Sequence, residues 1–279
     1  MKKIELIGHS GCPLILQEKK GRLEVTKTSK DSDYNKRLEL QCKKQQNFSH
    51  PYFLTPTIFK SGVTMDGRFQ FSMEYINGIR LADAFHTLPL SSISDITSIF
   101  KTLIPKELMF DLEAPIIFRK KIAELKKQLH NRSKTVLEGI AMLDSHDWEH
   151  CVHTQCHGDL TLENIIVSNK RYYLIDFLDS FYESWMVDFA KLLQDCECFW
   201  SYRHLSKRDE NLEIRLSIFK QLLSEVILSL PNGNELFREI YYILLINLVR
   251  IVPYVQEEHT AVFLDDAMEK VIRKIKKLS

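Results

Sequence analysis

The sequence predicts an α+β protein in which a small antiparallel sheet precedes a mainly helical remainder. Short strand-like runs separated by turn residues fill the N-terminal part, and apolar residues at helical spacing dominate beyond residue 80. A chain of 279 residues with 44% hydrophobic residues is long enough for two compact parts with a substantial core. Its few glycines and prolines argue against disorder.

The first strands are expected at residues 4–7, 13–17 and 23–28, with turns between them. The first turn carries Gly8 and Gly11, whose missing side chains let a backbone approach phosphate groups. A plain hairpin turn is the alternative for the same two residues.

Residues 33–46 follow with helix-like spacing and carry Glu39 between two leucines. Residues 69–76 are an apolar strand that ends at Asn77-Gly78, a typical turn pair. Because strands give way to helices here, we predict an N-terminal lobe at residues 1–78 and a helical lobe at residues 79–279.

The remaining helices are predicted from apolar residues that recur on one face, at residues 91–103, 115–143, 187–204, 211–230, 235–252 and 261–278. The stripe Phe118, Ile122, Leu125 and Leu129 is assigned to core packing. Polar residues interrupt the apolar stretch 240–255, so it is expected to be a buried helix and not a membrane span.

The net charge of +1 excludes a global field directed at nucleic acid or membrane. The N-terminal run is too short for a secretory signal and is broken by Glu5 and His9. We therefore expect a cytoplasmic protein without nucleic-acid or membrane partners. The six cysteines lack the spacing of a disulfide framework, and Cys151, His153, Cys156 and His157 do not match a common zinc module.

Three oxygen-bearing side chains surround a predicted hairpin at residues 165–167 and 172–175. Asn164 opens its first strand and Asp176 leaves its second, so both can face one ion, while Asp159 lies on the preceding loop. Phosphoryl transfer from a magnesium nucleotide needs a carboxylate to orient the attacking hydroxyl and oxygen ligands for the metal. Any one of these residues could be an ordinary turn or cap residue, but their joint pattern favours the chemistry.

The motifs His157-x-Asp159-x4-Asn164, Ile175-Asp176-Phe177 and Asp188-Phe189-Ala190-Lys191 together resemble the aminoglycoside phosphotransferase and choline kinase family. This resemblance implies a protein-kinase-like two-lobed fold, with a small antiparallel-sheet N-lobe and a mainly helical C-lobe. It implies that Asp159 is the catalytic base and that Asn164 and Asp176 bind Mg²⁺. Asp188 would hold the catalytic loop through buried hydrogen bonds, and His157 would support Asp159.

The same resemblance implies a nucleotide site in the N-terminal lobe. Lys27 would contact the phosphates and Glu39 would position Lys27, as a strand lysine and a helix glutamate do in kinase-like folds. The alternative for both is a solvated surface charge whose pairing contributes little. The turn with Gly8 and Gly11 would cover the nucleotide.

Residues 69–78 resemble the hinge between the lobes of this family. The carbonyl of Glu74 and the amide of Ile76 would face the adenine edge, and Met73 would border the purine pocket. An edge strand followed by a turn is the plainer interpretation, and both can hold together.

Two departures from related kinases affect the acceptor. Phe177-Leu178 stands where protein kinases carry Phe-Gly, and no Ala-Pro-Glu anchor follows, which favours a small-molecule acceptor. Residues 183–187 replace the Gly-x-Pro turn that often precedes the last aspartate of the family.

The expected function is therefore an ATP- or GTP-dependent phosphotransferase that acts on a hydroxyl of a sugar, an amino sugar or an amino alcohol. Its partners would be a nucleoside triphosphate and that acceptor. An atypical protein kinase and a nucleotide-binding pseudokinase scaffold are the alternatives. The oligomeric state stays open, as does the question whether Trp185, Phe199, Trp200 and Tyr202 line the acceptor pocket or the core.

Overall fold

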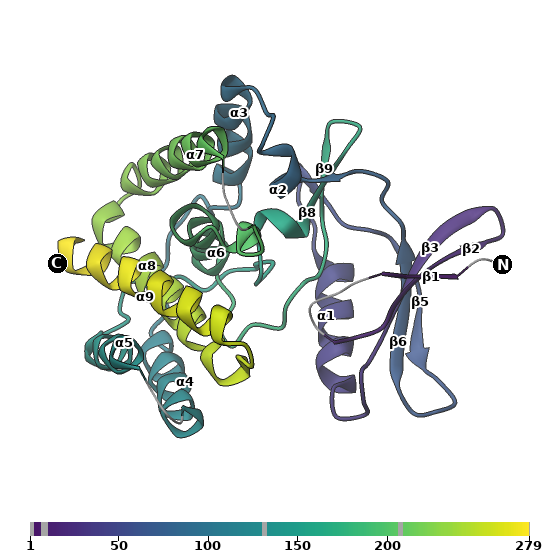
Figure 1. Ribbon diagram of the computed structural model, residues 1–279, viewed down its shortest axis with the longest axis horizontal. Helices are drawn as coiled ribbons and strands as arrows, with labels where there is room; N and C mark the ends of the chain where they lie inside the picture. Colours follow the sequence, from purple (N-terminus) through teal and green to yellow (C-terminus); the bar gives the residue numbers. More distant parts are fainter. Residues whose placement is uncertain (1–2, 7–10, 130–132, 206–208, 279) are drawn as a thin grey trace. The chain divides into compact units, whose positions relative to one another are not determined.

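The computed structural model describes residues 3–6, 11–129, 133–205 and 209–278. The chain forms two compact units (Figure 1), of which the first comprises Met1–Leu81 and Glu163–Asp179 and the second Ala82–Leu162 and Ser180–Ser279. The sequence predicted a lobe boundary after residue 78, whereas the first segment of this unit ends at Leu81 and residues 163–179 also belong to the unit. The lobe boundary at residue 78 stays a prediction.

The first unit contains an antiparallel sheet that has five strands within the described residues, in the order β1-β2-β3-β6-β5. Its strands are β1 Lys3–Leu6, β2 Leu14–Lys19, β3 Arg22–Thr28, β6 Phe69–Glu74 and β5 Ile58–Val63. The sequence predicted all of them except β5. Within the described residues that strand pairs with β6 alone, and its register shifts between Ile58 and Lys60, so its side chains do not alternate regularly.

Helix α1 Asn35–Asn47 packs on this sheet through a buried cluster of Leu38, Cys42, Phe69 and Phe71. The buried residues of α1 are Leu38, Gln41, Cys42 and Gln45, at helical positions i, i+3, i+4 and i+7. Two glutamines therefore lie on the stripe that faces the interior of the unit.

A second sheet of the first unit has the strand order β4-β9-β8-β7 among the described residues. Its strands are β4 Phe53–Leu54, β9 Arg171–Leu174, β8 Ile165–Ser168 and β7 Ile79–Arg80. The predicted hairpin is present as β8 and β9. Asn169 and Lys170 turn it, with φ angles of 49° and 59°.

Gly78 lies where the segment after β6 passes close to β8. A Cβ atom at this position would lie 2.5 Å from the carbonyl oxygen of Val167 and 2.6 Å from Cγ2 of Ile166. We expect Gly78→Ala to destabilise the protein by about 1–3 kcal/mol, because the backbone must move to admit the methyl group. Urea unfolding measures the change. Gly62→Ala is the matched control, since a Cβ at residue 62 meets nothing within 4 Å, and equal effects of the two substitutions would contradict the steric argument.

The second unit is mainly helical, and α2 Leu81–Ala84 leads into it. Its other helices are α3 Leu90–Lys101, α4 Ala114–Gln128, α5 Lys134–Ser145, α6 Trp185–Cys198, α7 Glu210–Leu228, α8 Gly233–Val249 and α9 Glu258–Leu278. Helix α8 is buried almost throughout, as its apolar stretch predicted. Within the described ranges, none of the helices has the length and hydropathy that a membrane crossing needs.

The single helix predicted at residues 115–143 was wrong, because two helices, α4 and α5, occupy this range. Ser133 starts the second of them, and its Oγ accepts a hydrogen bond of 3.1 Å from the Val136 amide. A serine N-cap satisfies an otherwise unpaired amide of the first turn. The predicted helix at residues 187–204 is likewise shorter, since α6 ends at Cys198 and Phe199 takes a left-handed conformation with φ 56°.

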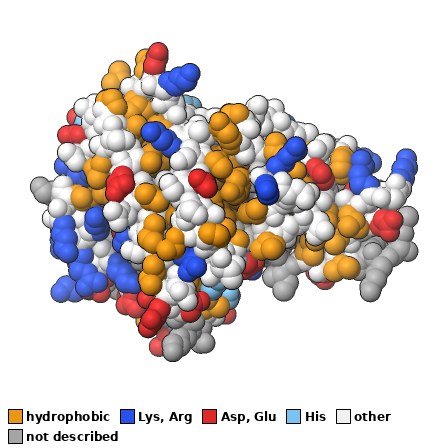
Figure 2. Space-filling view, turned by 90° about the horizontal axis from the view of Figure 1, so that it is seen from above, with side chains coloured by type: hydrophobic (Ala, Val, Ile, Leu, Met, Phe, Trp, Pro, Cys, Tyr) orange, Lys and Arg blue, Asp and Glu red, His pale blue; other side chains and the backbone are white. Residues whose placement is uncertain are grey.

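Figure 2 shows that acidic, basic and apolar side chains are interspersed on the face in view. This distribution agrees with the nearly equal numbers of 38 Lys and Arg and 37 Asp and Glu residues.

Candidate active site

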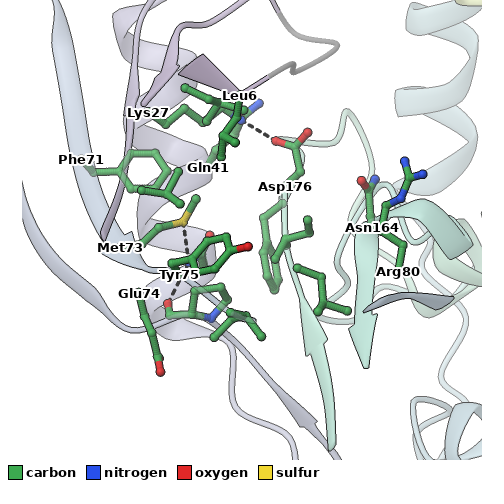
Figure 3. A pocket seen from close by; sticks show the side chains of 18 of the residues that line it. Leu6, Lys27, Gln41, Phe71, Met73, Glu74, Tyr75, Arg80, Asn164 and Asp176 are labelled. Atoms are coloured by element: carbon green, nitrogen blue, oxygen red, sulfur yellow. Dashed lines mark hydrogen bonds and ion pairs between the residues drawn. The ribbon is translucent and has the colours of Figure 1, made fainter. Parts of the chain in front are cut away.

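A cavity of about 240 Å³ lies in the first unit (Figure 3). Strands β2, β3 and β6, helix α1 and the β8–β9 hairpin contribute to its wall. Its polar lining includes Lys27, Gln41, Glu74, Arg80, Asn164 and Asp176. Apolar side chains form most of the rest, so the cavity has the apolar wall with a few convergent polar groups that small-molecule sites share.

The sequence-predicted residues of the first unit converge on this cavity. Lys27 reaches it from β3, and Met73 from β6, followed along the chain by Glu74 and Ile76. The predicted metal-binding residues Asn164 and Asp176 line the same cavity from the two ends of the β8–β9 hairpin. The pairing of β3 with β6 brings the strands of Lys27 and Met73 together, and the pairing of β8 with β9 brings Asn164 near Asp176.

Lys27 and Asp176 form an ion pair in the cavity (Figure 3). The lysine is buried, whereas the side chain of Asp176 is 40% exposed. Burial alone would lower the pKa of Lys27, but the carboxylate of Asp176 outweighs it and holds this pKa above its ordinary value. Asp176 takes a left-handed φ of 61°, a backbone conformation that is uncommon outside glycine and recurs at functional sites.

The predicted pair of Lys27 and Glu39 is not formed. Glu39 instead forms an ion pair of 2.7 Å with Lys43 on the exposed side of α1, and its side chain is 44% exposed. Two residues further along, Gln41 faces the cavity. Residues two positions apart point to nearly opposite sides of a helix. The orientation of α1 that buries Leu38 and Cys42 therefore turns Glu39 outward.

Gln41 is a cavity residue that the sequence argument missed. It is buried, and its Oε1 has no hydrogen-bond partner within the part of the chain that the structure describes. A buried carbonyl oxygen without a donor is costly. A polar residue on the apolar stripe of α1 was the signal that could have identified it.

Gln45 lies one turn beyond Gln41 and shapes another part of the wall. Its Nε2 donates a hydrogen bond of 2.9 Å to the Pro56 carbonyl and lies 3.7 Å from the Met73 sulfur. Both Gln45 and Met73 line the cavity. The glutamine therefore fixes the side of the cavity that Met73 was predicted to border.

The predicted nucleotide-covering turn is only partly described. Gly8 lies outside the described residues, whereas Gly11 adopts a left-handed φ of 70°. Leu6 and Leu14 are paired where β1 and β2 meet this turn, and both line the cavity.

The loop that carries Asp159 belongs to the second unit. Asp188 on α6 is buried and accepts hydrogen bonds from the amides of His157, at 2.7 Å, and Gly158, at 2.8 Å. These are buried hydrogen bonds of the kind that the family resemblance implies for this aspartate. His157 is also buried, and its Nδ1 accepts from the Asp159 amide at 3.2 Å. Gly158 has a φ of 90°, which only glycine adopts readily.

Two further residues of α6 contact this loop and were not predicted to do so. Asp195 accepts hydrogen bonds from the amides of Leu162, at 2.6 Å, and Ser201, at 2.8 Å. Lys191 Nζ lies 3.0 Å from Asp159 Oδ1. Asp195 stands seven residues after Asp188, and that spacing on one helix face is the signal that could have identified it.

The structure separates the four aromatic residues whose place was left open. Trp185 and Tyr202 are core residues, and the Tyr202 hydroxyl donates to the Ala82 carbonyl at 2.9 Å. Phe199 and Trp200 are partly buried.

Residues 107–209 match the sequence model of the phosphotransferase enzyme family. The matched segment includes the Asp159 loop, the β8–β9 hairpin and α6. A comparison with curated protein sequences gives no match.

Solved structures share the fold at low sequence identity. A thermostable mutant of aminoglycoside phosphotransferase APH(4)-Ia, in a ternary complex with ADP and hygromycin B, is 14% identical with a TM-score of 0.64, over 98% of this chain and 93% of that chain. A putative fructosamine-3-kinase from Haemophilus somnus is 14% identical with a TM-score of 0.56, over 99% and 91%. Choline kinase LicA from Streptococcus pneumoniae is 15% identical with a TM-score of 0.54, over 97% and 93%.

These structural neighbours establish the protein-kinase-like fold, with its antiparallel sheet and its mainly helical part. The family match over residues 107–209 and the shared fold together confirm the predicted resemblance to the aminoglycoside phosphotransferase and choline kinase family.

Proposed function

We propose that this protein transfers the terminal phosphoryl group of ATP or GTP to a hydroxyl of a small molecule. The observation that carries the proposal is the cavity of the first unit, where Lys27, Asn164 and Asp176 meet. A lysine, an amide oxygen and a carboxylate are the groups that phosphoryl transfer uses to bind phosphates and their metal ion.

The nucleotide would lie along this cavity with its base and its phosphates at different ends. Figure 3 places Lys27 and Asp176 at the upper end of the view and Glu74 and Tyr75 at the lower end. Met73, Glu74 and Ile76 would border the base, and Lys27 would bind the phosphates. Because Lys27 is buried, the attraction of its ammonium to a phosphate is less screened than at a surface.

The residues at the phosphate end suit a magnesium ion. Mg²⁺ prefers oxygen ligands and is usually bound by one or two protein side chains together with substrate phosphates. Asn164 and Asp176 offer such oxygens in one cavity, so we assign the metal to them. When bound, the ion would offset the negative charge of the phosphates.

Asp159 would orient the acceptor hydroxyl and accept its proton as the phosphoryl group is transferred. Its backbone is well placed for that role, because buried aspartates of α6 anchor the loop on both sides of it. A side chain that must point in one direction for catalysis benefits from a firmly anchored backbone.

The acceptor would be an alcohol that also carries an amine. The structural neighbours are named for an aminoglycoside, a fructosamine and choline, and each of these compounds combines a hydroxyl with a nitrogen that carries a positive charge or can gain one. We therefore propose amino sugars and amino alcohols as the first acceptors to test, ahead of neutral sugars.

The test has two steps. Thermal unfolding with and without Mg-ATP or Mg-GTP measures nucleotide binding, which raises the melting temperature of a protein that binds. Coupled release of the nucleoside diphosphate then screens amino sugars, amino alcohols and sugars. Stabilisation by nucleotide together with acceptor-dependent turnover supports the proposal. Transfer of the labelled phosphoryl group of the nucleotide to proteins alone contradicts it, and so does the absence of nucleotide binding.

Gln41→Leu should weaken nucleotide binding by about tenfold, because the cavity loses one hydrogen-bonding group worth about 1.4 kcal/mol. Its effect on stability should be small, since the Oε1 that it removes has no partner among the described residues. Nucleotide titration of the folded variant measures the loss. Glu39→Gln is the matched control and should bind as the wild type does, because Glu39 is exposed; the reverse ranking would contradict this assignment.

A further inference from the structure

Helix α6 directs three charged side chains at the loop that carries Asp159. Asp188, Lys191 and Asp195 occupy positions i, i+3 and i+7, which lie on one face of a helix. They are 1%, 8% and 0% exposed, respectively. The two aspartates accept backbone amides at the two ends of the loop, and Lys191 contacts the side chain of Asp159 between them.

The burial of Lys191 makes this contact informative. A buried ammonium is unfavourable unless a carboxylate and hydrogen bonds compensate the lost hydration. Asp159 is the carboxylate that lies within 4 Å of Lys191 in the described part of the chain, at 3.0 Å. Its own side chain is 31% exposed, so one partner is held inside while the other remains accessible to a substrate.

The support of Asp159 is thus divided between backbone and side chain. Its amide is bound by His157, and the neighbouring amide of Gly158 by Asp188. These contacts act on the backbone, whereas the ammonium of Lys191 contacts the carboxylate itself.

We propose that Lys191 is a positioning residue that holds the Asp159 carboxylate in the direction required by the acceptor hydroxyl. The inference deepens the proposed function and rests on it. Lys191 from α6 and His157 from the loop both contact Asp159, and Asp188 and Asp195 flank Lys191 on the same helix face.

Lys191→Met removes the charge and keeps a side chain of similar length. We expect kcat to fall by about ten- to a hundredfold, as for a displaced catalytic group, while the KM for the nucleotide changes little. Lys191→Arg should restore part of kcat. A kcat for Lys191→Met within about twofold of wild type would overturn the proposal, since misplacement is expected to be much larger.

Lys220→Met is the matched control. Lys220 on α7 forms an ion pair of 3.4 Å with Glu197. The control should keep the wild-type kcat. A similar loss in both variants would show a general effect of removing a paired lysine and would overturn the specific role of Lys191.

A double-mutant cycle tests the contact without any turnover. Urea unfolding is compared for Lys191→Met, Asp159→Asn and the variant with both changes. If the two side chains interact, the double variant loses less stability than the sum of the single losses, whereas additive losses overturn the inference. A wild-type protein that turns over no acceptor would refute the proposed function, and the cycle would still decide whether the pair exists.

Discussion

Replacing Asp159 by asparagine should lower kcat by about 10²–10⁴-fold while nucleotide binding is kept, because a positioned acid–base group contributes that much. Asparagine has nearly the same shape but can neither carry the charge nor accept a proton. The cavity proposed for the nucleotide belongs to the first unit, and Asp159 is not among the residues that line it. Steady-state kinetics and a nucleotide titration measure the two expectations.

Asparagine is a better test here than alanine. Asp159→Ala would remove the oxygen that the buried Lys191 contacts, whereas asparagine keeps an amide oxygen there, so a larger loss of stability would accompany the loss of activity. Asp144→Asn is the control, since Asp144 forms a surface ion pair of 2.7 Å with Lys126 and should keep full activity. Undiminished turnover by a folded Asp159→Asn protein would refute the role of this carboxylate.

Asp176→Ala should abolish magnesium-dependent nucleotide binding and also destabilise the protein. The substitution removes a proposed metal ligand and the partner of the buried Lys27. We expect a stability loss of about 2 kcal/mol, less than for a fully buried pair because solvent reaches the aspartate. Titration of nucleotide with and without Mg²⁺, together with urea unfolding, measures both effects, and an unchanged titration would count against the metal assignment.

The stability effect should depend on pH in a defined direction. The pKa of Lys27 is raised in the folded protein, so the ion pair stabilises fully below the unfolded lysine pKa of about 10.4 and this contribution is lost as pH rises through the folded value. The stability advantage of wild type over Asp176→Ala should therefore be constant near neutral pH and shrink above about pH 10.4. An advantage that persists unchanged at higher pH would show that the ion pair is not its cause.

The sequence was most informative where a local pattern has one simple physical cause. Alternating apolar residues and turn pairs predicted β1, β2, β3 and β6 and the β8–β9 hairpin. The spacing of Asp159, Asn164 and Asp176 around that hairpin pointed to the cavity that Asn164 and Asp176 line.

Local sequence patterns gave wrong predictions where the outcome depended on which face of a helix is buried or on the residue that caps a helix. Glu39 has the charge that a partner of Lys27 needs, but the apolar stripe of α1 turns Gln41 to the cavity and Glu39 to Lys43. Continuous apolar spacing through residues 115–143 concealed the restart at Ser133, because a serine cap changes the backbone without interrupting the pattern.

The sequence alone determined β1, β2, β3, β6 and the β8–β9 hairpin, the family resemblance and the residue types that we propose for phosphoryl transfer, since these follow from patterns along the chain. Only the tertiary structure decided that Lys27 pairs with Asp176, that Gln41 enters the cavity, and that α6 supports the Asp159 loop through Lys191 and Asp195. Each of these contacts joins segments that are distant in the chain or depends on which face of a helix is buried. A buried charge is unfavourable without an oppositely charged partner. Which residue becomes that partner depends on the folded arrangement and cannot be predicted from a local sequence pattern.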